Sequence, residues 1–211
     1  MSRRTLGATL AAAALLSTAA AAPENSGPRQ RLTVVADSPS ATTAVLTAWQ
    51  REGGSWKRAY GPVEAFVGRD GIGQASETTS HTPAGVWPLS EAFGIEPATT
   101  RLPYRRVTTA DWWVSDVRSP YYNTHVSCVP GTCPFDEAAG EDLGRAGPVY
   151  AHAVVIDYNR HPVVPGAGSA FFLHVTDGKP TAGCVAIAGA DLEAVLRWLD
   201  PAQHPVVDIS G

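Results

Sequence analysis

Apolar and polar residues alternate along several short stretches of the chain, and this alternation predicts strands. The pattern runs through residues 31–38 and again through residues 42–68, where the pair Gly53-Gly54 interrupts it. A glycine pair between two alternating segments is typical of a tight turn, so residues 42–68 are expected to form a hairpin. Residues 82–94 begin with a turn-forming Thr-Pro-Ala-Gly and predict a further strand.

Longer apolar runs follow in the second half of the chain. Residues 149–159 and 169–175 are rich in Val, Ala and Phe and predict buried strands, and residues 204–210 predict a last strand. Residues 188–200 instead have the spacing of a helix, and Pro201 follows the end of that segment. Four apolar side chains share one face of this helix: Leu192, Val195, Leu196 and Leu199.

Residues 111–126 contain several aromatic residues but no regular alternation, and we expect them to form a loop. Short strands at close spacing with a single helix near the end indicate a mainly β domain with one C-terminal helix. The arrangement that suits such a pattern is a sandwich or a barrel rather than a series of β-α-β units.

The first residues of the chain have the pattern of a secretory signal peptide. The basic pair Arg3-Arg4 precedes an apolar run, and small residues follow up to Ala21, where cleavage is expected. We therefore expect residues 1–21 to be a signal peptide, residues 22–31 to be flexible, and residues 32–211 to form one domain. The sequence leaves open whether the signal is cleaved or kept as an anchor.

Composition and charge narrow the possible functions. The formal net charge is −4, and it becomes −6 if the signal peptide with its two arginines is removed. A protein of this charge, without a basic stretch, is not expected to bind nucleic acid. The chain has no phosphate-binding loop and no His-rich metal motif, so we expect no cofactor and no metal. We expect a secreted monomer.

The three cysteines divide into a pair and a single residue. Cys128 and Cys133 flank a Pro-Gly turn, and in an exported protein such spacing favours a local disulfide. The alternative is a metal site that combines both thiols with His125, although no fourth ligand is evident. In either case Cys184 has no partner.

Cys184 follows Gly183 and lies ten residues after His174, which ends an apolar strand. A loop of this length can return the chain so that imidazole and thiol lie side by side. An imidazolium beside a thiol lowers its pKa and makes it a nucleophile, and the amides of Gly183 and Cys184 could then bind an oxyanion. The alternative from spacing alone is a buried, unreactive thiol beside a core histidine.

The stretch Phe-Phe-Leu-His-Val-Thr-Asp-Gly-Lys-Pro-Thr-Ala-Gly-Cys-Val-Ala-Ile, residues 171–187, resembles the signature of the L,D-transpeptidase catalytic domain (YkuD) family. That signature has a histidine, a variable loop and Ser/Thr-x-Gly-Cys. Weaker likeness covers roughly residues 55–208. The resemblance implies a β-sandwich-like catalytic domain that acts on peptidoglycan outside the membrane, in cell-wall synthesis and cell shape.

The resemblance also implies a role for each matching residue. Cys184 matches the nucleophile, which takes the acyl group of a tetrapeptide stem and releases D-alanine, and His174 matches the general base. A backbone carbonyl commonly orients that imidazole, and Val175 or Thr181 could supply it. Gly183 and the Cys184 amide match the oxyanion site. An amine of a neighbouring stem would complete a 3→3 cross-link, and carbapenems would label the thiol.

Two positions depart from the family pattern. Many members have histidine where Ala182 stands and arginine where Ala186 stands, which puts recognition of the donor peptide in question. Two alternatives therefore stay beside transpeptidation: an L,D-carboxypeptidase that uses water as acceptor, and a non-catalytic module of the same fold that binds the cell wall.

Other polar residues are candidates for binding substrate. Tyr122 and Asn123 lie in the long loop, which is the kind of segment that often builds a binding site. His152 lies on the predicted strand 149–159, where it could face the site or be a structural histidine. We expect the tryptophans of the loop, Trp112 and Trp113, to pack rather than line a cleft.

Overall fold

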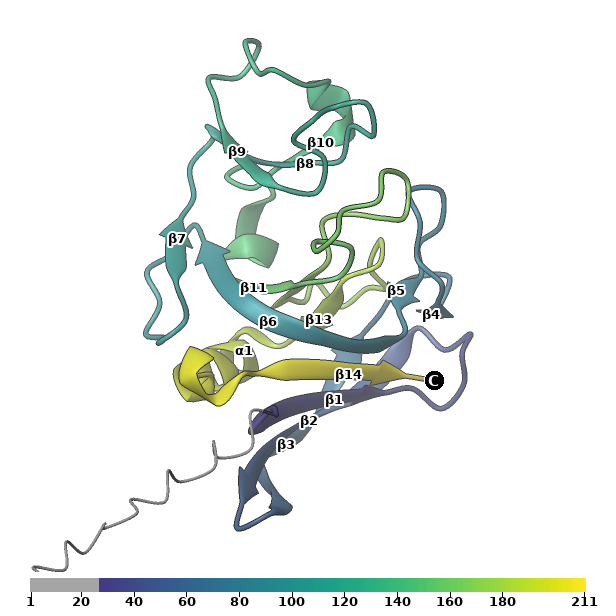
Figure 1. Ribbon diagram of the computed structural model, residues 1–211, viewed down its shortest axis with the longest axis vertical. Coiled ribbons are helices and arrows are strands. Elements are labelled where there is room, and N and C mark those ends of the chain that lie inside the picture. Colours follow the sequence, from purple (N-terminus) through teal and green to yellow (C-terminus); the bar gives the residue numbers. More distant parts are fainter. Residues whose placement is uncertain (1–26) are drawn as a thin grey trace, which may run out of the picture.

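The computed structural model describes residues 27–211, and its main feature is a sheet of nine strands. The order is β11-β12-β13-β3-β2-β1-β14-β6-β7, and β11 also pairs with β6, so that the sheet closes on itself as a barrel (Figure 1). The mainly β fold with one helix is as expected. Its strands are β1 (Gln30–Val35), β2 (Thr43–Glu52), β3 (Ser55–Phe66), β6 (Gly85–Gly94), β7 (Tyr104–Arg106), β11 (Ala153–Ile156), β12 (Phe172–Val175), β13 (Val185–Ile187) and β14 (Val206–Ser210).

The expected hairpin is confirmed. β2 and β3 pair antiparallel from Thr43↔Phe66 to Glu52↔Ser55, and Gly53 and Gly54 form the turn with φ values of +56° and +84°. Glycine takes such left-handed values without the steric cost that a Cβ would add.

The single α-helix, α1 (Gly189–Trp198), directly follows β13 and covers one side of the barrel. Its buried residues include three of the four predicted on one face, and the fourth, Leu199, is buried just past the helix end. They pack against barrel residues such as Leu32 and Leu46. The apolar stripe of α1 is therefore part of the main core. A short 3-10 turn, η3 (Pro201–Gln203), leads from α1 into β14.

The predicted boundaries at the N-terminus need one correction. The signal peptide expected at residues 1–21 lies outside the described residues, as do residues 22–26 of the segment 22–31 that was expected to be flexible. However, β1 already begins at Gln30, which is buried because its side-chain amide donates to the Trp198 carbonyl (2.8 Å) and its oxygen accepts from Asp200 N–H (2.8 Å). Among residues 27–211, no helix has the length and apolar character needed to cross a membrane.

Residues 107–150, which we call the cap, are inserted between β7 and β11, and their three-stranded sheet is seen at the top of Figure 1. The prediction of a loop over residues 111–126 was wrong at both of its ends. The cap contains a three-stranded sheet in the order β10-β8-β9. Its elements are β8 (Asp111–Val114), β9 (His125–Ser127), η1 (Glu137–Ala139), β10 (Gly140–Asp142) and η2 (Gly147–Tyr150). A further short pair, β4 (Ile72–Gly73) with β5 (Thr82–Pro83), precedes β6.

The disulfide between Cys128 and Cys133 closes a loop in the cap between β9 and η1. With both sulfurs bonded to each other, the alternative metal site loses two of its ligands. His125 instead lies 2.8 Å from Asp111 through its Nε2 atom. No group of three potential metal-binding side chains occurs within residues 27–211.

Candidate active site

A cavity of about 450 Å³ lies between the barrel and the cap. Cys184 and His174 line it from the barrel, and Glu141 and Tyr150 line it from the cap. The strand register explains why the first two line the same cavity. β12 and β13 are neighbouring parallel strands with His174 paired to Ala186, so Cys184, directly before β13, lies on the adjacent strand two residues from the position opposite His174.

The thiol of Cys184 is held by backbone groups on the strand beside it. Its sulfur accepts a hydrogen bond from Phe172 N–H (3.3 Å) and donates to the Ala170 carbonyl (3.4 Å). Burial raises the pKa of the thiol above its ordinary value, and the charge of Glu141 adds to this effect. The expectation that a neighbouring imidazolium lowers this pKa was therefore wrong, because removal from water dominates.

The imidazole of His174 is oriented by the next residue in the chain. Its Nδ1 lies 2.9 Å from the carbonyl of Val175. Because a carbonyl can only accept, Nδ1 carries the hydrogen and Nε2 presents a lone pair when the ring is neutral. Burial lowers the pKa of His174, although the hydrogen bond to Val175 partly offsets this. The Tyr150 ring packs edge-on against the imidazole with 5.5 Å between centroids.

Thr181 and Gly183 shape the turn before the nucleophile. The Thr181 hydroxyl donates to the Cys184 carbonyl (2.7 Å) and accepts from Gly183 N–H (3.0 Å). Gly183 has a φ of +141°, and a Cβ at this position would lie 2.7 Å from the Phe171 ring. Of the two carbonyl groups considered for His174, the one in contact is that of Val175. Of the two amides considered for the oxyanion, that of Gly183 is already bonded within the turn.

The two departures from the family signature lie in different surroundings. Ala182 is exposed and lines the cavity, so a larger side chain here would project into it. Ala186 is buried on β13, where its backbone pairs with both His174 and Phe66.

The structure does not place the three predicted substrate-binding residues in this cavity. Tyr122 is buried, donates its hydroxyl hydrogen to Glu77 and accepts from Gly168 N–H (3.1 Å). His152 lines a different, smaller pocket beside α1, where its Nδ1 lies 3.2 Å from the Tyr104 hydroxyl. Both side chains already have protein partners, so we withdraw them as substrate contacts.

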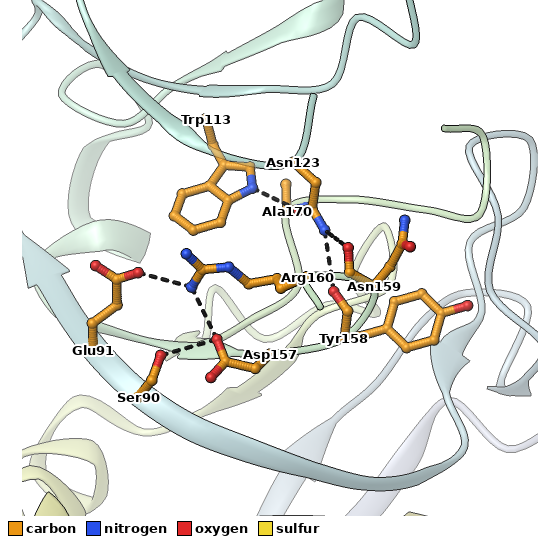
Figure 2. Close-up of polar contacts among 9 residues, drawn as sticks. All are labelled: Ser90, Glu91, Trp113, Asn123, Asp157, Tyr158, Asn159, Arg160 and Ala170. Atoms are coloured by element: carbon orange, nitrogen blue, oxygen red, sulfur yellow. Dashed lines mark hydrogen bonds and ion pairs between the residues drawn. The ribbon is translucent and has the colours of Figure 1, made fainter. Parts of the chain in front are cut away.

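Asn123 is the third of these residues, and its contacts are structural (Figure 2). Its side-chain oxygen accepts from Trp113 Nε1 (2.9 Å) and Ala170 N–H (3.2 Å), and its amide donates to the carbonyls of Tyr158 (3.1 Å) and Asn159 (2.8 Å). Its hydrogen-bonding groups are thus occupied. Because Asn123 and Trp113 belong to the cap, this side chain fastens the cap to the loop that follows β11.

Arg160 strengthens the same junction (Figure 2). Its Nη1 lies 2.8 Å from Glu91 and 2.9 Å from Asp157, and its guanidinium stacks 5.1 Å from the centre of the Trp113 ring. The Arg160 side chain is only 16% exposed, so the charge is shielded from solvent and depends on these partners. The expectation that Trp113 packs is met by this contact and by its edge-on contact with Phe172.

Sequence reasoning missed the charged residues that surround the nucleophile. Arg69, Glu77, Glu141, Asp177 and Lys179 all line the cavity. They come from three separate segments of the chain, and no motif marks the first three. Only Asp177 and Lys179 lie inside the recognised signature, so proximity in sequence could have indicated them.

Comparison with known protein families identifies the family of this chain. Residues 31–207 match the family described as YkuD, L,D-transpeptidase catalytic domain. No curated protein matches the chain. Among solved structures, the chain is similar to a mutant of the helical cell shape determining protein Pgp2 from Campylobacter jejuni, at 13% identity and a TM-score of 0.43. The match covers 87% of this chain and 47% of that chain, so it spans about half of the solved protein.

Proposed function

The chain belongs to the L,D-transpeptidase catalytic domain family, and we propose that it is an exported cysteine acyltransferase that forms 3→3 cross-links in peptidoglycan. The observation that carries the proposal is that Cys184 and a correctly oriented His174 line one cavity, with Nδ1 of the imidazole held 2.9 Å from Val175 O. An imidazole fixed in this way presents Nε2 as the base for the thiol.

The first half of the reaction is acylation of Cys184. Burial favours the neutral forms of both groups, since it raises the pKa of the thiol and lowers that of the imidazole. His174 therefore takes the thiol proton as sulfur attacks the carbonyl carbon of the donor stem, and gives it to the departing D-alanine. We assign the Cys184 amide to the developing oxyanion, because the Gly183 amide is bonded to Thr181.

The second half transfers the acyl group to an acceptor. An amine of a neighbouring stem, most simply the side-chain amine of diaminopimelate, would attack the thioester carbonyl and release the Cys184 thiolate. Water in the same position would give an L,D-carboxypeptidase. The same nucleophile predicts covalent labelling by carbapenems. Such an enzyme works in the cell wall, outside the membrane, as a monomer.

Product analysis tests this proposal directly. The protein is incubated with a purified disaccharide-tetrapeptide, and the products are separated by chromatography and identified by mass. A cross-linked dimer with release of D-alanine supports transpeptidation, whereas free tripeptide alone supports the carboxypeptidase. Binding of the muropeptide with neither product, unchanged in Cys184→Ala, would instead favour the non-catalytic cell-wall-binding module.

A further inference from the structure

Glu141 is the acidic side chain that the cap presents to the nucleophile. It lies in the middle of β10, opposite Trp113 on β8, and its side chain lines the cavity that also contains Cys184 and His174. Its charge raises the pKa of Cys184, as expected for a carboxylate that lines the same cavity as the thiol.

The carboxyl group of Glu141 has few partners inside the protein. It accepts a hydrogen bond from the Tyr150 hydroxyl, and it forms no ion pair with any residue of 27–211. The cations that line the cavity, Arg69 and Lys179, are exposed and do not pair with it. Glu141 is only partly buried, and a carboxylate at the wall of a cavity with one donor can accept further hydrogen bonds. Glu141 therefore keeps free acceptor positions toward the cavity.

The proposed reaction brings a cation into this cavity. An aliphatic amine is an ammonium ion near neutral pH, because its pKa lies near that of lysine, at about 10.4. It can attack a thioester only after it loses a proton. Water carries no charge, so it forms no ion pair with a carboxylate and is not concentrated beside the thioester as an ammonium ion is. A carboxylate beside the thioester would thus favour amines over water.

We propose that Glu141 binds the ammonium group of the acyl acceptor and takes one of its protons, and thereby selects an amine over water in the second half-reaction. The inference rests on the proposed function, since it needs an acyl-enzyme on Cys184. Burial raises the pKa of Glu141, which makes it a stronger base than an ordinary carboxylate and agrees with this role.

In the proposed step one proton passes from the ammonium to the Glu141 carboxylate, and the amine lone pair then forms a bond to the thioester carbon. The carbon–sulfur bond breaks as the tetrahedral intermediate collapses, and the electron pair returns to Cys184 as thiolate. His174 takes the second proton from nitrogen and passes it to the thiolate. Glu141 returns its proton to solvent.

The test compares the wild type with Glu141→Gln, which keeps the shape and removes the charge. Glu141→Asp keeps the charge, and Glu64→Gln is the matched control, because Glu64 is exposed on β3 and forms no ion pair or side-chain hydrogen bond within residues 27–211. Each protein receives a tetrapeptide donor together with a stem peptide that carries a free side-chain amine. Release of D-alanine reports acylation, and the ratio of cross-linked dimer to hydrolysed tripeptide reports the choice of acceptor.

We expect Glu141→Gln to release D-alanine in the first turnover, which reports acylation alone, at a rate within a few-fold of wild type. Its dimer-to-tripeptide ratio should fall by about 100-fold, the low end of the contribution of a general base. The ratio should recover as the pH is raised toward the pKa of the amine, and Glu141→Asp should lie between the two. An unchanged ratio in Glu141→Gln, or a loss of D-alanine release with the ratio preserved, would overturn the inference. Failure of the wild type to release D-alanine would instead refute the proposed function.

Discussion

The carbonyl of Ala170 lies 3.4 Å from the sulfur of Cys184, and it accepts the hydrogen of the thiol. The amide of the same residue donates to Asn123 in the cap across 3.2 Å. Ala170 adopts a left-handed φ of +57°, which lets its two backbone groups serve the two partners. One residue thus connects the docking of the cap to the position of the nucleophile.

Asn123→Ala should therefore loosen both the cap and the thiol. The substitution leaves four hydrogen-bonding groups around position 123 without a partner, and two of them, Trp113 Nε1 and Ala170 N–H, are donors. We expect a loss of about 2–4 kcal/mol in the free energy of unfolding, measured by urea denaturation. Iodoacetamide should also modify Cys184 faster than in the wild type. Wild-type stability with wild-type alkylation would show that Asn123 does not connect cap and thiol.

The protonation state of the Cys184 thiol predicts how the alkylation rate of this residue depends on pH. Its pKa is raised above the ordinary 9.0, so the folded protein keeps the neutral thiol at pH values where an exposed thiol has ionised. The alkylation rate of the folded protein should still rise above pH 10, whereas that of the urea-unfolded chain, whose thiol has the ordinary pKa of 9.0, levels off there. A plateau below pH 8 in the folded protein would indicate a thiolate–imidazolium pair instead.

The raised pKa of Cys184 also makes the free energy of unfolding depend on pH. The direction of this dependence follows from whether the folded or the unfolded chain ionises first. Above pH 9 the unfolded chain loses the thiol proton while the folded chain retains it, so the contribution of the neutral thiol to stability is present below 9 and lost as the pH rises. The free energy of unfolding of the wild type should fall more steeply above pH 9 than that of Cys184→Ala, in parallel denaturation curves. Equal slopes would contradict the raised pKa.

Substitution of Arg160 tests the contact between the cap and the loop that follows β11, which Figure 2 shows. Arg160→Ala removes the partner of Asp157, whose carboxyl is 10% exposed, and removes the cation that stacks on Trp113. We expect a loss of about 2–3 kcal/mol in the free energy of unfolding, below the range for a fully buried pair because solvent reaches Glu91. Arg160→Lys should lose less, since it keeps the charge. If Arg160→Lys loses as much free energy of unfolding as Arg160→Ala, the effect would come from the stacking of the guanidinium on Trp113 and not from the charge.

The strands and helix that could be predicted are those whose pattern is local. The β2–β3 hairpin has alternation and a glycine turn, and α1 has one apolar face and a proline after its end. The β8 strand was missed because all four of its residues are buried, so no polar position alternates with the apolar ones. β9 and β10 have three residues each, which is too short for a periodic signal.

The residues of the candidate site also fall into those that the sequence could predict and those that it could not. Cys184 and His174 could be brought together from the sequence because one loop joins them and a family signature marks them. Glu141 could not be assigned to the site from the sequence, because only the fold of the cap brings it to the cavity. Asn123 was misinterpreted for a physical reason. A polar side chain in a long segment can bind the backbone as readily as a ligand, and the four protein partners of Asn123 are evident only in three dimensions.

The disulfide in the cap is expected to matter little for catalysis. It closes a loop with a sequence separation of only five residues, and neither Cys128 nor Cys133 lines the cavity. The double variant Cys128→Ser/Cys133→Ser should lose at most about 2 kcal/mol in stability, because short loops gain little from cross-linking. Its release of D-alanine from a tetrapeptide donor should stay within a few-fold of wild type. Complete loss of release in a folded variant would show that this loop shapes the site.

The central claim is that Cys184 is an accessible nucleophile activated by His174, and intact-protein mass spectrometry with meropenem tests it most directly. Wild type, Cys184→Ser and His174→Ala are incubated with the carbapenem beside an established L,D-transpeptidase. The account predicts one adduct on the wild type, none on Cys184→Ser, and much slower formation on His174→Ala. A wild type that stays unmodified while the established enzyme is labelled would contradict it and leave Cys184 as a buried structural thiol.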